Sequence, residues 1–327
     1  MLLNLPIVLW AQKSNYQISS RFPIKSNGGW DYITVYKNNL YVSHGTQVNI
    51  INKSTGDSVG VIPNTTGVHG IAFDPTQNIG FTSNGKLNNV FAFNVATNEV
   101  VATIPTGENP DAIMYDPFTK TIITCNGRGK NLSFIDPVTF KVLGQVEVGG
   151  KPETAVSDEA GNIYVNVEDK NEIVKIDALH YKVLAHWSIQ PVEEPTGLAI
   201  DLANKRLFAA GEKKMAVVNY TNGKVVATVP IGEGCDGLVY DPKQKMIFTS
   251  NGEAGTLSVI RVINDHSYQL IDNLKTAKSA RTIAIDEASG MLYLPAAQFQ
   301  PQPAGVSENK RTPIVPGSFN VLVVSKK

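Results

Sequence analysis

Residues 232–260 read GEGCDGLVYDPKQKMIFTSNGEAGTLSVI, and residues 66–93 read TGVHGIAFDPTQNIGFTSNGKLNNVFAF. The two stretches share an apolar run, an Asp-Pro turn and a Phe-Thr-Ser-Asn tetrapeptide in the same order, so the chain contains an internal repeat. Repeats with periods of about 20 to 50 residues are typical of solenoids and propellers. The number of copies and the content of one copy therefore decide the fold.

Seven segments match the start of this repeat, at intervals of 38 to 45 residues. They are Trp30–Ile33, Val68–Ile71, Pro110–Ile113, Pro152–Ala155, Pro195–Leu198, Cys235–Leu238 and Ala280–Ile283. Each copy continues through an Asp turn into further short apolar runs, separated by turn residues. Four strands in about 40 to 45 residues correspond to one blade of a β-propeller. The sequence therefore predicts an all-β, seven-bladed β-propeller.

The two ends of the repeat array fit together. The seventh copy has no fourth strand of its own, because the sequence stops soon after the third, at residues 319–324. Residues 16–24 look like an orphan fourth strand, and pairing the two would cover an open sheet edge. We therefore expect the N-terminal strand to complete the last blade. The predicted blades are 28–65, 66–106, 107–148, 149–190, 191–231, 232–276, and 277–327 together with 16–24.

The second strand of the repeat carries the signature of a known family. Phe81-Thr82-Ser83-Asn84 and Phe248-Thr249-Ser250-Asn251 resemble the tetrapeptide of the YVTN-repeat, or YncE-like, β-propellers. Blades five and seven depart from it, with Phe208-Ala209-Ala210-Gly211 and Tyr293-Leu294-Pro295-Ala296. The resemblance covers nearly the whole chain from about residue 16. It implies a mostly exported bacterial family of poorly defined role, whose relatives by architecture include lactonases, and it transfers no catalytic motif.

Composition and the N-terminal residues indicate the cellular compartment and limit the classes of partner. Residues 1–12 contain an apolar run that ends at the small residue Ala11, which is typical of a secretory signal peptide, although the basic start is missing. We expect a signal-peptide remnant here, and a periplasmic or secreted bacterial protein. The chain has 29 Lys and Arg against 29 Asp and Glu, which makes nucleic-acid binding unfavoured. No segment is long and apolar enough for a transmembrane helix, which needs about 20 residues.

The changes between copies concentrate at one position. In a propeller the first strand of each blade lines the central channel, so equivalent positions form a ring. Around that ring the sequence reads Asp31, His69, Asp111, Glu153, Thr196, Asp236 and Arg281. Four carboxylates at one level repel one another unless some are protonated, a cation lies among them, or Arg281 and water offset the charge. The ring residues, except Thr196, are our candidate ligand-binding residues.

A second candidate ring follows the second strand of each blade. Asn84, Asn126 and Asn251 occupy it in three blades, and their amides offer both donors and acceptors. His44 occupies it in the first blade, and together with His69, Asp31 and Asp111 it forms a weak candidate metal site. Oxygen ligands would suit Ca²⁺ or Mg²⁺, and imidazole would favour Zn²⁺. The alternative interpretation is that these side chains bond the backbone at strand ends.

Two functional interpretations stay open. The first is an exported binding protein, expected to be a monomer, that engages a small molecule, a peptide or a protein partner on the polar channel face. The second is a metal-dependent hydrolase of lactonase type that uses the ring carboxylates as ligands. The Pro-rich loop 296–318 follows the second strand of the last copy and is either a lid or an insertion. Cys125 and Cys235 lie in blades that are not neighbours, so we expect no disulfide between them.

Overall fold

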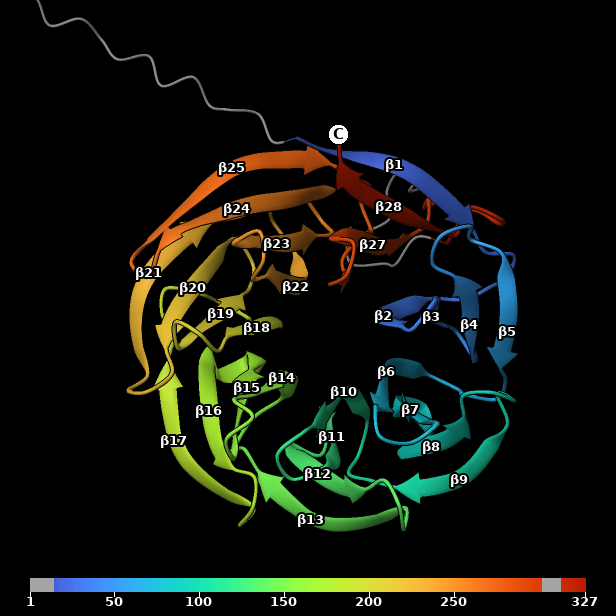
Figure 1. The fold of residues 1–327 in the computed structure, drawn as a ribbon, viewed down its shortest axis with the longest axis horizontal. Helices are drawn as coiled ribbons and strands as arrows, with labels where there is room; N and C mark the ends of the chain where they lie inside the picture. Colours follow the sequence, from blue (N-terminus) through green and yellow to red (C-terminus); the bar gives the residue numbers. More distant parts are fainter. Residues whose placement is uncertain (1–14, 302–312) are drawn as a thin grey trace, which may run out of the picture.

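The computed structural model describes residues 15–301 and 313–327. Across these residues, seven four-stranded antiparallel sheets surround a central axis (Figure 1). The predicted all-β, seven-bladed β-propeller is therefore confirmed. The predicted leader, residues 1–12, lies outside the described residues, as do residues 302–312 of the Pro-rich loop.

In the first six blades, four consecutive strands run from the channel to the outer rim. Blades one to three contain β2 (Trp30–Tyr36), β3 (Asn39–His44), β4 (Gln47–Asn52), β5 (Ser58–Ile62), β6 (Val68–Asp74), β7 (Ile79–Asn84), β8 (Asn89–Asn94), β9 (Val100–Pro105), β10 (Pro110–Asp116), β11 (Thr121–Asn126), β12 (Asn131–Asp136) and β13 (Lys141–Glu147). Blades four to six contain β14 (Pro152–Ser157), β15 (Asn162–Val167), β16 (Glu172–Asp177), β17 (Lys182–Ser188), β18 (Gly197–Asp201), β19 (Arg206–Ala210), β20 (Lys214–Asn219), β21 (Lys224–Pro230), β22 (Cys235–Asp241), β23 (Met246–Asn251), β24 (Thr256–Asn264) and β25 (Ser267–Lys275).

The last blade joins the two ends of the chain. Its strands, from the channel outward, are β26 (Ala284–Asp286), β27 (Met291–Ala296), β28 (Asn320–Lys326) and β1 (Tyr16–Pro23). The outermost strand, β1, pairs antiparallel with β28 from the Tyr16–Lys326 pair to the Pro23–Asn320 pair, with one register shift. This pairing confirms the predicted closure by the N-terminal strand, and it covers the edge that β28 would otherwise expose.

One aromatic position packs the interfaces between blades. The second strands of six blades carry an aromatic side chain at equivalent positions, all of them almost fully buried: Tyr41, Phe81, Tyr164, Phe208, Phe248 and Tyr293. These residues are the first letters of the repeated tetrapeptide. Burying an aromatic side chain removes a large apolar area from water, so this position stabilises each sheet against its neighbours.

Buried aspartates shape the turns between the first and second strands. In blades two, three and six, the carboxylates of Asp74, Asp116 and Asp241 accept hydrogen bonds from backbone amides two or three residues further on. Aspartate favours such turns because its side chain replaces the missing backbone acceptor. The recurring aspartate of the repeat is therefore a turn-forming residue, and it lies apart from the ring positions at the other end of each inner strand.

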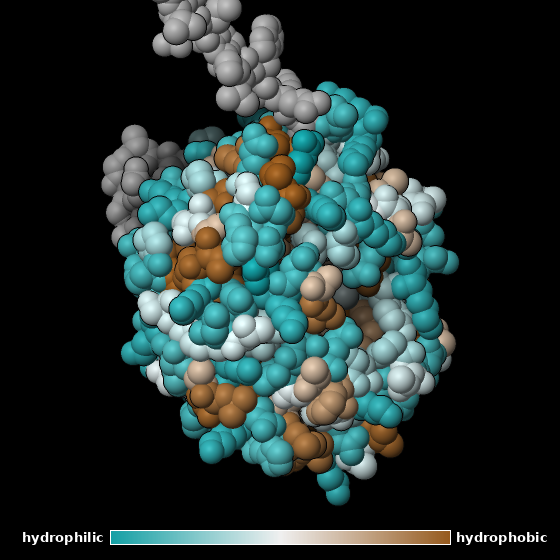
Figure 2. Space-filling view, turned by 60° about the vertical axis from the view of Figure 1, so that its left-hand side comes forward, coloured by the Kyte–Doolittle hydropathy of each residue, from teal (hydrophilic) through white to brown (hydrophobic). Residues whose placement is uncertain are grey.

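Helical structure is almost absent from the described residues. It consists of two short 3-10 helices, η1 (Gly85–Leu87) and η2 (Glu168–Lys170). No helix in the described part of the chain has the length and apolar character to cross a membrane. Figure 2 shows a mostly hydrophilic face on which the apolar residues form small, separate patches.

The described part of the Pro-rich loop is anchored beside the first blade. Phe299 and Ile314 form an antiparallel bridge, and the backbone amide of Val315 donates to the carbonyl of Gln298 at 2.8 Å. The Phe299 ring stacks on Trp30 with 6.1 Å between ring centroids. The base of the loop is therefore packed against the strand that carries the ring residue Asp31.

Candidate functional site

The ring positions lie at irregularities in the inner strands. In blades one to four and in blade six, the register between the first and second strands shifts across the ring residue: Asp31, His69, Asp111, Glu153 and Asp236. A bulge of this kind leaves residues out of the ladder and changes the direction of a side chain. The repeated bulge explains why consecutive blades direct polar side chains toward one another at the same level.

Hydrogen bonds between blades hold the backbone of the ring in place. The hydroxyl of Thr34 donates to the carbonyl of Ile71 in the next blade at 2.8 Å, and that of Thr282 donates to the carbonyl of Asp31 at 2.6 Å. The hydroxyl of Thr196, the uncharged ring member, donates to the carbonyl of Cys235 in the next blade. These bonds join blades one and two, blades seven and one, and blades five and six, so they restrain the backbone at several of the ring positions.

Three ring residues from consecutive blades form a compact group. Nδ1 of His69 lies 2.6 Å from Oδ2 of Asp31 and 3.6 Å from Oδ1 of Asp111. One ligand atom from each residue lies within 4.8 Å of the other two. One imidazole nitrogen and two carboxylate oxygens are a donor set that zinc and similar ions accept. We refer to Asp31, His69 and Asp111 as the channel triad.

Arg281 connects the triad to the sixth blade. Its guanidinium lies 3.3 Å from Oδ1 of Asp31, donates to Oδ2 of Asp236 at 2.8 Å, and donates to the carbonyl of Trp30 at 2.9 Å. Arg281 therefore occupies one oxygen of Asp31 while the other oxygen contacts His69. Such an arrangement orients a carboxylate toward a bound ligand.

A second basic residue, Lys151, forms ion pairs with two carboxylates of the fourth blade. Nζ of Lys151 lies 2.7 Å from Oε1 of Glu153 and also contacts the carboxylate of Glu168. One ammonium group is thus shared between two carboxylates. Sequence reasoning placed Lys151 only in a connecting loop and did not include Glu168. The signal that could have identified them is the antiparallel pairing of β14 with β15: Lys151 directly precedes the first of these strands, Glu168 directly follows the second, and the two positions therefore lie side by side.

The buried charges of the ring perturb one another. Burial lowers the pKa of His69, but the hydrogen bond to Asp31 and the charges of Asp111 and Asp31 more than offset this, so its pKa is raised. Burial and the charge of Asp31 raise the pKa of Asp111 to about 6. Burial and the charge of Asp111 raise the pKa of Glu153 to about 8, despite Lys151. The ring thus holds more acid than its bases neutralise, which favours uptake of protons or of another cation.

The asparagines of the second candidate ring lie inside their blades. Asn84, Asn126 and Asn251 are fully buried, and their amides donate to side chains that begin the third strand. The amide of Asn126, for example, donates to Asn131 at 2.8 Å and to Ser133 at 2.9 Å. The structure therefore places these three amides within their own blades, hydrogen-bonded to side chains of the neighbouring strand, and whether they bind a ligand stays a prediction.

His44 is not part of the triad. Its Nδ1 contacts the hydroxyl of Ser26, its Nε2 lies 2.9 Å from the carbonyl of Gly28, and its ring stacks on Phe319. Burial lowers the pKa of His44. Both nitrogens are occupied by neighbours, so the expected contribution of His44 to a metal site is not seen. Of the four predicted metal ligands, the structure brings together the three of the channel triad.

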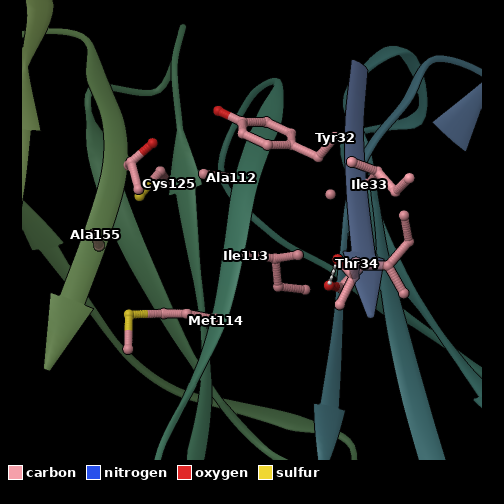
Figure 3. Close-up of a pocket in the computed structure, with 11 residues that line it drawn as sticks. Tyr32, Ile33, Thr34, Ala112, Ile113, Met114, Cys125 and Ala155 are labelled. Atoms are coloured by element: carbon pink, nitrogen blue, oxygen red, sulfur yellow. Dashed lines mark hydrogen bonds between the residues drawn. The ribbon is translucent and has the colours of Figure 1, made fainter. Parts of the chain in front are cut away.

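Tyr32 follows the ring and was not among the predicted site residues. Its side chain extends from β2 toward the strand that carries Ala112 (Figure 3). Burial and the charges of Asp111, Glu153 and Asp31 raise its pKa well above the usual value, so the hydroxyl stays protonated. Asp31 and Tyr32 lie between the Trp30–His44 pair and the Ile33–Val42 pair, where the register shifts. This bulge is visible only in the structure.

Comparisons with known proteins define the fold and leave the family open. No protein-family model matches this chain, and no curated protein matches its sequence. Among solved structures, a chain of Kuenenia stuttgartiensis hydrazine synthase is similar, with a TM-score of 0.73 and 14% identity over 83% of this chain and 94% of that chain. A similarity at this identity shows the β-propeller fold alone. The resemblance to YVTN-repeat propellers remains a prediction.

Proposed function

We propose that this propeller is a non-enzymatic binding protein that holds a divalent metal ion at the channel triad. The observation that carries the proposal is the convergence of Nδ1 of His69 with carboxylate oxygens of Asp31 and Asp111 within 4.8 Å. The three donors come from three separate blades, and the rigid inner strands preorganise them. The mixed donor set favours Zn²⁺ or Mn²⁺ over Ca²⁺, which prefers oxygen ligands only.

The charges around the triad support a cation. A metal ion would replace the proton shared among Asp31, His69 and Asp111 and would remove the mutual repulsion of the two carboxylates. Arg281 would keep its contact with Oδ1 of Asp31 at 3.3 Å and act as an outer partner. Export from the cytoplasm is part of the proposal, because residues 1–12 have the composition of a leader.

Calorimetric titration of the chelator-treated protein with Zn²⁺, Mn²⁺ and Ca²⁺ tests the proposal. We expect one Zn²⁺ or Mn²⁺ per chain, with affinity that rises with pH because binding releases protons. His69→Ala and Asp111→Asn should each weaken binding at least tenfold. Asp236→Asn is the matched control, since Asp236 contacts Arg281 but lies outside the triad. Equal affinity in the triad variants, or no saturable binding, would exclude the site.

A hydrolase of lactonase type is the second candidate. Three protein ligands leave a coordination position for water, which a bound metal ion would acidify. Glu153, whose pKa burial and the charge of Asp111 raise to about 8, lies on the next blade and is the candidate proton donor or acceptor for such a reaction. A panel of lactones tested with the metal-loaded protein separates the two candidates. Turnover that is lost in Asp111→Asn and Glu153→Gln would favour the enzyme, and no turnover with intact metal binding would favour the binding protein.

A further inference from the structure

A cavity of about 120 Å³ lies directly beyond the charged ring, on the inner strands of the first four blades. Its lining consists of residues that follow the ring positions along β2, β6, β10 and β14, together with one residue of β11: Tyr32, Ile33, Thr34, Gly70, Ile71, Ala112, Ile113, Met114, Cys125, Thr154 and Ala155. Figure 3 shows this space between β2 and the strands of the third and fourth blades. The channel therefore changes from charged to mostly apolar within one to three residues.

The side-chain hydroxyl groups of the lining already take part in hydrogen bonds. The hydroxyl of Thr34 donates to the carbonyl of Ile71 at 2.8 Å, and the hydroxyl of Tyr32 is hydrogen-bonded by Thr154. Five buried side-chain nitrogen or oxygen atoms of the described residues have no hydrogen-bond partner, and none of the five belongs to this lining. A water molecule needs about two to four polar partners to occupy a cavity stably, and the side chains of this lining offer few.

The size and the access of the cavity suit a small molecule. A dry apolar cavity of about 150 Å³ accommodates benzene, and the volume here is close to that. The side chain of Tyr32, which directly follows the ring residue Asp31, reaches across one end of this space (Figure 3). Thr34, Ile113 and Met114 are half-buried, so solvent reaches their end of the cavity and provides a path for a ligand.

We infer that the cavity beneath Tyr32 is a binding site for a small, uncharged apolar molecule about the size of benzene. The driving force is the removal of the ligand and of the isoleucine and methionine side chains from poorly bonded water. The ligand is distinct from the cation proposed for the channel triad, because the cavity offers no charged group. This inference does not depend on the proposed metal site, and each can fail alone.

Titration with benzene and with xenon, followed by NMR of the isoleucine and methionine methyl groups, tests the inference. We expect saturable shifts of Ile71, Ile113 and Met114, and an increase in melting temperature at saturating benzene. Methyl groups in other parts of the core, such as Ile260, should not shift. Shifts that are absent, that do not saturate, or that spread over the core would overturn the inference.

Two variants change the volume of the cavity in opposite directions. Ala155→Leu fills the space and should weaken benzene binding at least tenfold. Met114→Ala enlarges it and should increase the affinity for p-xylene relative to benzene, which tests the site even where the filled variant does not fold. Lys213→Met is the control, because Lys213 forms an exposed ion pair with Glu233, lies outside the lining and should leave benzene binding unchanged. Unchanged selectivity in Met114→Ala, or full benzene affinity in a folded Ala155→Leu, would contradict the site.

Discussion

Nδ1 of His69 lies 2.6 Å from Oδ2 of Asp31, although 38 residues separate them in the sequence. The contact exists because one repeat of the chain returns the backbone to the channel at the same level. Residues that are still further apart in the sequence meet at the channel for the same reason. Arg281, from the last blade, donates to the carbonyl of Trp30, which is 251 residues away. Ring closure thus makes the first and last blades neighbours and completes the charged ring.

Asp31→Asn should lower the pKa of His69. The substitution removes one nearby negative charge and replaces the carboxylate acceptor with a neutral amide oxygen, which favours the charged imidazole less, and it leaves the opposing effect of burial. We expect a decrease of roughly 1 to 3 units, measured by NMR titration of the imidazole resonances. Asp236→Asn, outside the triad, should change this pKa much less. An unchanged value in Asp31→Asn would show that the contact is not formed in solution.

Glu153→Gln should alter how stability depends on pH. The pKa of Glu153 is raised in the folded protein to about 8 from an ordinary value of 4.5, so the folded state binds the proton more tightly than the unfolded chain does. Stability from this group is therefore present below about pH 4.5 and is lost as the pH rises to about 8. At pH 8 the variant should be more stable than the parent by on the order of 1 kcal/mol.

Denaturant unfolding at pH 5 and pH 8 measures this effect of Glu153→Gln. The difference between variant and parent should be small at pH 5 and larger at pH 8. Glu108 is exposed, and Glu108→Gln is a matched control that should leave the pH profile unchanged. A parent protein that gains stability over the same pH range, with no change in slope on substitution, would contradict the prediction.

Arg281→Met should destabilise the fold. The substitution leaves Asp31 and Asp236 without their shared cation. Unpairing a fully buried charge costs about 3 to 5 kcal/mol, but the Arg281 side chain is 39% exposed and solvent screens part of the loss. We expect about 1 to 2 kcal/mol from urea denaturation. Lys213→Met breaks an exposed pair with Glu233 and should change stability little, so equal effects of the two substitutions would refute a special role for Arg281.

Deletion of residues 1–23 should destabilise the protein and promote aggregation. The deletion removes β1, exposes the edge of β28, and eliminates the buried side chain of Phe22. Melting temperature and light scattering measure the two effects. A shorter deletion of residues 1–12 keeps the strand and serves as the control. Equal melting temperatures for the two truncated proteins would show that β1 does not stabilise the closed ring.

Neither cysteine should react with a disulfide reagent in the native protein. Burial is the largest cause that raises the pKa of Cys125 and of Cys235, so neither thiol forms a reactive thiolate near neutral pH. Both are buried and unpaired. Titration with an aromatic disulfide should therefore give no reaction in buffer and two thiols per chain in guanidinium chloride. Rapid native reaction that is lost in Cys235→Ser would contradict this prediction.

The repeat made the fold and the triad predictable. Copies with the same spacing must place equivalent residues at equivalent levels, so Asp31, His69 and Asp111 could be assigned to one ring from their order alone. The asparagines could not be assigned in this way. The sequence does not distinguish an asparagine whose amide is buried within a blade from one whose amide faces the channel. The partners that the neighbouring strand offers decide between the two. The amide of Asn126, for example, donates hydrogen bonds to Asn131 and Ser133 of the strand beside it.

By itself the sequence determined the all-β class, the seven blades and the closure by residues 16–24, because alternating apolar runs and turn residues depend on local geometry that is repeated along the chain. Only the tertiary structure decided the partners of each charged group. It decided that Arg281 contacts both Asp31 and Asp236, that His44 bonds the carbonyl of Gly28 instead of joining the triad, and that Tyr32 lines a mostly apolar cavity. The physical reason is that distances across the channel depend on bulges and side-chain directions in several blades at once.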